Sequence, residues 1–339
     1  MAMRCTVLGA GSWGTALAVQ LGRQGHDVVL WDRNADRCAS MNRERRNPRY
    51  IKEVPLPKTL RAEPDLAAAT AHAEVLVPVV PSHALREVSR RAAPSLADDA
   101  VVCCATKGIE EGTGQTMAEV LGETLGAPFQ DRLSMLYGPS FALELGKGLP
   151  TAIVCAGEGS AREKAIDAFH GGSLRVYASD DVIGVCVGGS VKNVMAIACG
   201  VSDGVGLGAN ARAALITRGL AEITRLAVAM GANPLTMAGL AGMGDLVLTC
   251  TGNLSRNRRV GLALGQGRTL DDILEELGEV AEGVVTARST RELAHTLGVE
   301  MPITEQVHAL LYEGKPAQQA LMDLMGRRRK QELAGIDQA

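Results

Sequence analysis

The stretch CTVLGAGSWG, residues 5–14, decides the fold of this chain. Its first four residues form an apolar run typical of a buried strand, and residues 13–24 follow with a helical pattern that ends at Gly25, a favourable helix C-cap. Glycines between a strand and a helix allow a tight turn, and the helix N-terminus offers free N–H groups to a pyrophosphate. Glycines also mark ordinary turns, but the complete strand-turn-helix unit makes this G-x-G-x-x-G pattern specific. We therefore expect the three glycines of the turn to hold a dinucleotide.

Strand-like and helical segments alternate over the first half of the chain. The strand-like runs are residues 5–8, 28–31, 75–77, 101–103 and 133–136. They are apolar throughout, as strands buried on both faces of a parallel sheet are, and each needs a crossover helix to return parallel to its neighbour. Two similar runs, residues 151–155 and 174–177, extend the same sheet.

The sequence changes character after Asp181, where helical periodicity replaces the short strands. We predict an α/β fold in which residues 1–185 form a Rossmann-type, doubly wound dinucleotide-binding domain. Residues 186–339 are predicted to form an all-helical substrate-binding domain. We expect the active site in the cleft between the two domains.

The composition excludes several classes of function. The 35 basic and 38 acidic side chains leave a formal charge of -3, which attracts neither nucleic acid nor anionic membranes, and 3% aromatic residues are too few for a base-stacking surface. The longest apolar stretch, residues 182–191, is too short to span a bilayer and predicts a buried helix. The eight cysteines contain no C-x-x-C pair, and the N-terminus lacks the apolar core of a signal peptide. We expect a cytoplasmic protein without a metal site, a nucleic-acid partner or stable membrane insertion.

The residue that follows the second strand of a dinucleotide-binding fold usually distinguishes NAD from NADP. A carboxylate accepts hydrogen bonds from the ribose hydroxyls and repels a 2′-phosphate, whereas an arginine attracts one. This chain has both, because Asp32 precedes Arg33. Five more arginines follow, most of which we interpret as a solvated face: Arg37, Arg43, Arg45, Arg46 and Arg49. Charge alone leaves NADH and NADPH open.

The sequence GGSVKNV, residues 188–194, places Lys192 inside an otherwise apolar helical stretch. Burial lowers the pKa of a lysine towards neutrality, and a neighbouring carboxylate would hold it charged and oriented. A dehydrogenase that reduces a carbonyl needs a proton donor where hydride transfer places negative charge on oxygen. Lys192 is therefore a candidate general acid. A snorkelling or salt-bridged structural lysine is the alternative.

A second polar cluster follows the sequence GMGD at residues 242–245. Ser255 resembles a helix N-cap, and Arg256 and Asn257 follow it at the start of an apolar helical run. Helix N–H groups and guanidinium forks both suit tetrahedral oxyanions, so the cluster predicts a phosphorylated substrate. A polar helix terminus with surface arginines is the alternative.

Together these motifs resemble the bacterial NAD(P)-dependent glycerol-3-phosphate dehydrogenases over nearly the whole chain. The matching blocks are residues 9–14, 105–108, 138–142, 191–193, 202–204, 210–215, 244–245, 255–257 and 282–283. The resemblance implies reduction of dihydroxyacetone phosphate to sn-glycerol 3-phosphate, with Lys192 as the catalytic acid and base and Asp245 holding it charged. The implied substrate contacts are Lys107, Gly138, Ser140, Lys192, Asp245, Ser255, Arg256 and Asn257.

The resemblance also implies NADP(H) or NAD(H) as the cofactor. The implied cofactor contacts are Gly9, Gly11, Ser12, Trp13, Gly14, Arg33, Asn34, Tyr50, Lys107, Ala142, Arg256, Val280 and Glu282. The family often lacks an acid where Asp32 stands, so the preference between the two cofactors stays open. Two alternatives remain: another Rossmann-plus-helical dehydrogenase that acts on a hydroxyacid, and a catalytically silent dinucleotide sensor. The sequence is compatible with a homodimer but does not decide the oligomeric state.

Overall fold

The computed structural model describes residues 1–277, 281–329 and 331–332. The chain forms two compact units. The first consists of Met1–Thr106 and Met117–Val182, and the second of Lys107–Thr116 and Ile183–Ala339. The short segment 107–116 therefore belongs to the second unit, although in sequence it lies between a strand and a helix of the first.

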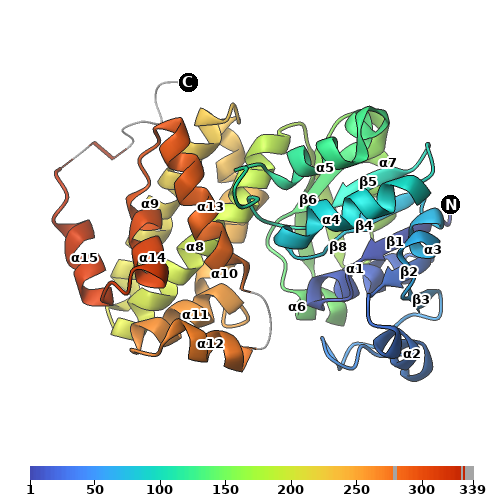
Figure 1. Ribbon diagram of the computed structural model, residues 1–339, viewed down its shortest axis with the longest axis horizontal. Coiled ribbons are helices and arrows are strands. Elements are labelled where there is room, and N and C mark those ends of the chain that lie inside the picture. The colour runs from blue at the N-terminus through green and yellow to red at the C-terminus, as the bar shows by residue number, and fades with distance from the viewer. Residues whose placement is uncertain (278–280, 330, 333–339) are drawn as a thin grey trace. The chain divides into compact units, whose positions relative to one another are not determined.

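The first unit is built on one eight-stranded sheet, whose strands carry the labels of Figure 1. They are β1 (Arg4–Leu8), β2 (Asp27–Trp31), β3 (Leu60–Glu63), β4 (Val75–Pro78), β5 (Val101–Cys104), β6 (Leu133–Tyr137), β7 (Thr151–Gly157) and β8 (Leu174–Ser179). Their order across the sheet is β3-β2-β1-β4-β5-β6-β7-β8. The chain crosses from one side of β1 to the other after β3, which is the strand order of a doubly wound fold and confirms the predicted class.

The sheet differs from the sequence prediction in two respects. β1 to β6 are parallel to one another, but β7 runs antiparallel to β6, and β8 is parallel to β7. The sheet is therefore mixed rather than parallel throughout. The connection between β6 and β7 contains only a short helix and does not cross back over the sheet, so the next strand returns in the opposite direction. The edge strand β3 was not predicted, because its sequence LRAE is short and half charged.

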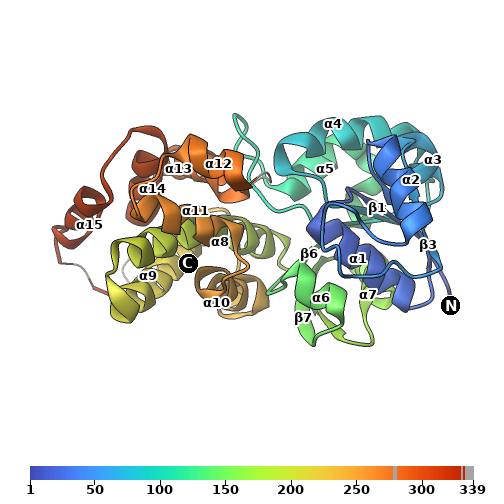
Figure 2. The same ribbon diagram turned by 90° about the horizontal axis from the view of Figure 1, so that it is seen from below.

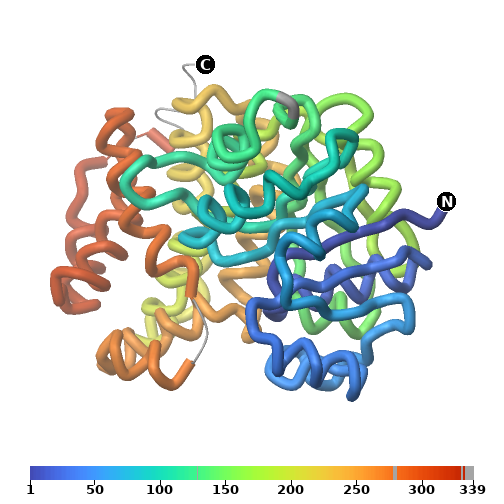
Figure 3. The backbone as a smooth tube through the Cα atoms, turned by 45° about the vertical axis from the view of Figure 1, so that its right-hand side comes forward, coloured from blue at the N-terminus to red at the C-terminus, as the bar shows by residue number. Residues whose placement is uncertain are grey.

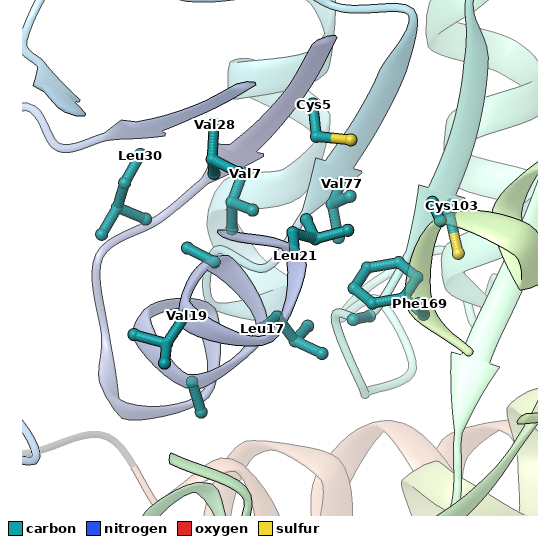
Figure 4. Packing of buried hydrophobic residues seen from close by; sticks show 14 of the residues in the cluster. Cys5, Val7, Leu17, Val19, Leu21, Val28, Leu30, Val77, Cys103 and Phe169 are labelled. Atoms are coloured by element: carbon teal, nitrogen blue, oxygen red, sulfur yellow. The ribbon is translucent and has the colours of Figure 1, made fainter. Parts of the chain in front are cut away.

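Helices cover both faces of this sheet, as Figure 2 shows, with α3, α4 and α5 on one face and α1 and α7 on the other. The helices of this unit are α1 (Ser12–Arg23), α2 (Ala35–Glu44), α3 (Leu66–Ala71), α4 (Ser82–Ala92), α5 (Met117–Leu125), α6 (Ala142–Lys147) and α7 (Gly159–Phe169). Leu17 and Leu21 of α1 and Phe169 of α7 pack against Val7 and Cys103 of the strands (Figure 4). Side chains of α1 are thus fixed to the sheet directly behind the glycine-rich turn.

The second unit is helical, as predicted. Its helices are α8 (Val182–Val205), α9 (Gly208–Ala229), α10 (Asp245–Thr251), α11 (Arg256–Gly265), α12 (Leu270–Leu277), α13 (Glu282–Leu297), α14 (Pro302–Tyr312) and α15 (Ala317–Met325), and their path can be followed in Figure 3. Short 3₁₀ and π turns, Pro234–Ala238 and Leu240–Gly244, precede α10. Among the described residues, α8 is the one helix long and apolar enough to cross a membrane. However, 83% of its most apolar stretch of 18 residues is buried inside the protein. The predicted burial of this helix is confirmed, but the expectation that the stretch is too short to span a bilayer is wrong, because the helix continues past Lys192 to Val205.

All eight cysteines are buried and carry free thiols. Cys103 and Cys104 lie on the buried strand β5, as predicted. The cysteines therefore act as small core side chains.

Glu222 of α9 is a buried carboxylate that holds the start of α14. It accepts hydrogen bonds from the backbone N–H groups of Ile303 (2.6 Å) and Thr304 (3.2 Å), which the helix itself leaves without partners. Burial raises the pKa of Glu222 to about 7, and these hydrogen bonds oppose the shift. The unfolded carboxyl has its ordinary pKa near 4.5. Between pH 4.5 and about 7, the folded state therefore binds more protons than the unfolded state.

We predict that this carboxyl makes the stability of the protein fall as the pH rises from about 5 to about 8. The free energy of unfolding of the wild type, relative to that of Glu222→Gln, should decrease over this range by on the order of 3 kcal/mol, at about 1.4 kcal/mol per pKa unit. Urea unfolding at both pH values measures the difference. The exposed Glu292→Gln variant serves as a control and should keep a constant offset from the wild type. A constant offset for Glu222→Gln as well would contradict the prediction.

Candidate active site

The glycine-rich turn between β1 and α1 has the geometry of a pyrophosphate site. Gly9 adopts a φ of +118°, a conformation that favours glycine. A Cβ at Gly14 would lie 1.9 Å from the carbonyl oxygen of Gly9, whereas a Cβ at Gly11 would meet open space. The N-terminus of α1 has no side-chain cap, so its first N–H groups remain available to an anion. The buried Trp13 Nε1 has no hydrogen-bond partner among the described residues. These features fit a dinucleotide.

The loop after α2 is anchored to this turn by Asn47, which sequence reasoning missed. The Asn47 side chain is fully buried and donates to the carbonyl oxygen of Ala10 (3.0 Å) and to Thr15 Oγ1 (2.9 Å). Its Oδ1 accepts from the backbone N–H groups of Arg49 and Tyr50. Asn47 thereby places Tyr50, a predicted cofactor contact, beside the glycine-rich turn. A polar residue before a proline signals only a loop in the sequence, which is why this role was not predicted.

The predicted cofactor residues Arg33 and Asn34 follow β2 at the carboxyl edge of the sheet. Asn34 is the N-cap of α2, and its Oδ1 accepts from Arg37 N at 2.8 Å. The interpretation of the following arginines as a solvated face is wrong for two of them. Arg37 pairs with Asp32, and Arg45 donates to the carbonyl oxygens of the chain at residues 56 and 57.

Three more predicted contacts follow β6, at the same edge of the sheet. Gly138 has a φ of +139°, and a Cβ there would lie 2.9 Å from the Cα of Ile153 on β7. Ser140 Oγ donates to the carbonyl oxygen of Gly138 at 3.1 Å, and α6 begins at Ala142. The requirement for glycine at this turn is therefore a close approach of two backbones.

Lys192 and Asp245 form a buried ion pair in the helical unit. Lys192 Nζ lies 2.5 Å from Asp245 Oδ1, and the two side chains are 8% and 1% exposed. Lys192 also donates to Thr249 Oγ1 at 2.9 Å, and Lys107 Nζ lies 2.7 Å from the other carboxylate oxygen, Asp245 Oδ2. The pairing of Lys192 with Asp245 is as predicted. Thr249 was missed, although it lies one helical turn after Asp245 and its position on the same helix face could have indicated it.

Two small residues of α8 let neighbouring segments of the backbone approach this helix closely near the ion pair. Gly188 of α8 lies one turn before Lys192, and a Cβ there would be 2.7 Å from the carbonyl oxygen of Ala241 in the π turn. Ser190, fully buried, accepts from Gly108 N at 2.9 Å and donates to Gly108 O at 3.1 Å. Gly188 thus lets the start of α10 approach α8, and Ser190 fixes the chain next to Lys107.

The environment of Lys192 shifts its proton affinity. Burial lowers the pKa of Lys192 to about 8, the charge of Asp245 opposes this shift, and the charge of Lys107 adds to it. With a pKa near 8, Lys192 can donate a proton as the ammonium and accept one as the neutral amine close to neutral pH. This cluster of two lysines and one carboxylate can therefore stabilise negative charge on an oxygen atom and exchange a proton with it.

The predicted phosphate site lies at the N-terminus of α11. Ser255 is its N-cap, as predicted, and its Oγ accepts from Arg258 N at 3.2 Å. Asn257 Oδ1 accepts from Gly283 N at 2.9 Å, next to the predicted cofactor contact Glu282. A Cβ at Gly283 would lie 2.7 Å from the carbonyl oxygen of Asn193, the residue after Lys192. The start of α11 is therefore close to α8 near Lys192. Val280, another predicted cofactor contact, lies outside the described residues.

Four glycines set the spacing between α8 and α11. A Cβ at Gly200 would lie 2.2 Å from the carbonyl oxygen of Arg258, and one at Gly261 would lie 2.0 Å from that of Ile197. Gly204 of α8 and Gly265 of α11 make a similar contact further along, where each would place a Cβ within 3.0 Å of the other's Cα. The two helix backbones are thus in direct contact. This contact fixes the α11 N-terminus along α8 and so relative to Lys192.

Among the described residues, no group of three or more histidine, cysteine, aspartate and glutamate side chains is arranged to hold a metal ion. The helical unit instead supplies the buried ammonium of Lys192 and the N-terminus of α11, where a phosphate site is predicted. Together with a doubly wound sheet that has a glycine-rich first turn, these features define a Rossmann-type, dinucleotide-dependent dehydrogenase.

Comparisons with known proteins agree with this class. Residues 4–163 match the family model of the NAD-dependent glycerol-3-phosphate dehydrogenase N-terminus, and residues 181–322 match that of its C-terminus. The chain is 54% identical over 332 residues to a glycerol-3-phosphate dehydrogenase [NAD(P)+] of Anaeromyxobacter dehalogenans, covering 98% of this chain and 100% of the relative. It is 51% identical to the Escherichia coli protein of that name, covering 96% of each. The crystal structure of glycerol-3-phosphate dehydrogenase from Coxiella burnetii superposes with a TM-score of 0.91 at 44% identity, covering 96% of this chain and 99% of the other. The chain belongs to the NAD-dependent glycerol-3-phosphate dehydrogenase family.

The contact between α8 and α11 leads to a prediction for Gly261→Ala. A methyl group at this position would clash with the backbone of α8, which cannot move aside as a flexible side chain would. We expect a loss of at least about 2 kcal/mol in the free energy of unfolding, measured by urea unfolding. Gly122→Ala in α5, where a Cβ meets open space, is the matched control and should be neutral or stabilising by up to about 1 kcal/mol. Equal stability of the two variants would show that the helices do not need this close approach.

Proposed function

We propose that this chain reduces dihydroxyacetone phosphate to sn-glycerol 3-phosphate, and catalyses the reverse reaction, with NADH or NADPH as the hydride donor. The observation that carries the proposal is the buried pair of Lys192 and Asp245, located near an anion-binding helix terminus in the same unit. Membership of the family supports it, because its curated relatives are named glycerol-3-phosphate dehydrogenase [NAD(P)+]. The product is a backbone precursor of glycerophospholipids.

Lys192 is the general acid in this proposal. A bound reduced nicotinamide would supply hydride to C2 of the substrate, which would leave negative charge on the oxygen of that carbon. The Lys192 ammonium stabilises this charge and donates its proton to the oxygen, while Asp245 keeps the ammonium charged and oriented. Thr249, which accepts from Lys192, fixes the direction of the side chain. In the oxidation direction the neutral amine of Lys192 accepts the proton.

The substrate phosphate binds at the N-terminus of α11. The uncapped N–H groups of the first turn and the guanidinium of Arg256 provide donors, and the hydroxyl of Ser255 can donate while it caps the helix. Asn257 uses its carbonyl oxygen for Gly283, which leaves its amide nitrogen to donate. Lys107, at the Asp245 carboxylate, adds a second positive charge. Gly138 and Ser140 are the remaining substrate contacts that the family resemblance implies. The cofactor contacts from Ala142, Arg256 and Glu282 belong to the same proposal.

The two other readings of the sequence have less support. A dehydrogenase for hydroxyacids is disfavoured by the family match, because the curated relatives are named glycerol-3-phosphate dehydrogenase [NAD(P)+]. A dinucleotide sensor without activity would have no use for a buried ammonium whose burial is costly unless it is paired. We also infer a cytoplasmic location, which is supported by eight free thiols that an oxidising compartment would expose to disulfide formation. A homodimer remains part of the proposal, and sedimentation velocity would test it.

The first test is an assay of the purified protein with dihydroxyacetone phosphate and either reduced cofactor, followed by the absorbance of the reduced nicotinamide. We expect oxidation of at least one cofactor, and a loss of at least about 100-fold in kcat for Lys192→Ala because the general acid is removed. Lys58→Ala, at an exposed position, is the control and should retain activity. No oxidation with either cofactor would refute the proposed function. Wild-type turnover by folded Lys192→Ala would refute only the role of Lys192.

The pKa of Lys192 gives the reaction a directional pH dependence. Reduction requires the protonated ammonium, so its kcat/KM should be constant below about pH 8 and fall at higher pH, while that of oxidation should rise. Since the charge of Asp245 raises the pKa of Lys192, Asp245→Asn should move the falling limb of reduction to lower pH. Initial rates in both directions from pH 6 to 10 measure this. A falling limb at the same pH in the variant would exclude Lys192 as the titrating group.

A further inference from the structure

The carboxylate of Asp32, which would disfavour NADPH if it faced the cofactor unpaired, already has partners within the protein. Asp32 directly follows β2, where a dinucleotide-binding fold places the acid that receives the ribose hydroxyls. Its Oδ1 accepts from Asn34 N at 2.9 Å and from Arg37 Nη2 at 2.8 Å, and its Oδ2 lies 2.7 Å from Arg37 Nε. Oδ1 of Asp32 therefore accepts two hydrogen bonds from its own chain, and Oδ2 is in ion-pair contact with Arg37.

Burial reinforces this arrangement. The Asp32 side chain is 7% exposed and that of Arg37 18%, so the pair is shielded from water and presents little surface to a ligand. Removal of one partner from a buried ion pair leaves an uncompensated charge, so Asp32 has a strong preference to keep Arg37. The paired carboxylate is electrically neutralised at short range. It is thus a poor acceptor for ribose hydroxyls and a weak source of repulsion for a phosphate.

Arg33 differs from the arginines that follow it. It is exposed, and no hydrogen bond or ion pair is found for it among the described residues. Arg43 pairs with Glu44, Arg45 donates to backbone carbonyl oxygens of the loop before β3, and Arg46 donates to Lys52 O. Of these four arginines beyond β2, Arg33 alone has its guanidinium unengaged in the described part of the chain. It directly follows Asp32, at the edge where the ribose of a dinucleotide binds.

We propose that Arg37 is a specificity-determining residue that acts through Asp32, and that it lets the end of β2 accept the 2′-phosphate of NADPH at Arg33. The inference rests on the proposed function, because it concerns the cofactor of that reaction. Arg37 acts as a positioning residue. It holds the carboxylate of Asp32 against α2 and cancels its charge, so the acid next to Arg33 does not oppose a phosphate.

The proposal separates two roles for Arg37 that a single substitution would confuse. If Arg37 acts through Asp32, Arg37→Gln releases an unpaired carboxylate that repels the 2′-phosphate, and the additional Asp32→Asn removes that repulsion. If Arg37 instead binds the phosphate itself, the second substitution restores nothing. A double-mutant cycle over these two positions therefore distinguishes the roles.

Direct binding of two adenosine ligands that differ only in the phosphate of interest gives a readout independent of turnover. The probes are adenosine 2′,5′-bisphosphate and adenosine 5′-monophosphate, titrated by isothermal calorimetry into the wild type, Arg37→Gln, Asp32→Asn, the double variant and Arg33→Gln. Arg43→Gln, on the same helix and paired with the exposed Glu44, is the matched control. Circular dichroism and thermal unfolding confirm that each variant is folded.

We expect the wild type to bind the bisphosphate more tightly than the monophosphate by at least about tenfold, which corresponds to ~1.4 kcal/mol. Arg37→Gln and Arg33→Gln should each lower this ratio by about tenfold, whereas Arg43→Gln and Asp32→Asn should leave it equal or higher. The double variant should recover most of the ratio lost in Arg37→Gln. An unchanged ratio in Arg37→Gln, or no recovery in the double variant, overturns the inference.

Kinetics with the full cofactors separates the failure of this inference from that of the proposed function. The ratio of kcat/KM for NADPH to that for NADH should fall in Arg37→Gln and recover in the double variant. Oxidation of both cofactors with a ratio that Arg37→Gln does not alter would overturn the role of Arg37 and leave the dehydrogenase activity intact. Absence of binding and of oxidation in the wild type would overturn both.

Discussion

The packing around α8 in the helical unit depends on one buried ammonium, that of Lys192, which requires a carboxylate partner. Lys192 lies in the core helix α8, where an unpaired charge would cost several kcal/mol, so the fold must bring a carboxylate to it. Asp245 meets this requirement from the first residue of α10, and the π turn before α10 approaches α8 closely at Gly188. Lys107 then meets the second oxygen of the same carboxylate. Lys107 and Gly108 belong to the segment 107–116, which is part of the second unit, and they contact Asp245 and Ser190 of that unit.

The same helix, α8, also positions the N-terminus of α11, which is the proposed phosphate site. Gly200 and Gly204 let α11 lie directly against α8, so the first turn of α11 cannot shift along α8 without backbone clashes. Reacting groups must be held within fractions of an ångström to be effective, and rigid helices do this better than loops. In the proposed mechanism, the proton donor Lys192 and the phosphate contacts Ser255 and Arg256 are therefore positioned relative to one rigid element, α8. The glycines of α8 permit this close packing.

In the first unit the predicted cofactor contacts lie mainly on loops at the carboxyl edge of the sheet. Two polar side chains connect this edge to neighbouring segments. Asn47 joins the loop of Tyr50 to the glycine-rich turn, and Arg37 joins α2 to the end of β2. Loops gain the precision of regular elements in this way, through hydrogen bonds whose loss would leave buried polar groups unpaired.

The sequence by itself determined much of the fold and the identity of most candidate site residues. Periodicity and glycine spacing report what the local backbone requires, so the strand-turn-helix unit at residues 5–24, the helical second half and the cap at Ser255 were predictable. The direction of β7 and the existence of β3 were not, because strand direction depends on the path of the connection and β3 lacks an apolar pattern. Apart from Lys192 and Asp245, whose pairing the family resemblance implied, only the tertiary structure decided which charges are paired. Asp245 lies 53 residues from Lys192 and 138 from Lys107, and Asp32 could face a ligand or Arg37 with the same sequence. Such pairings depend on how the chain folds back on itself in three dimensions, which local spacing does not encode.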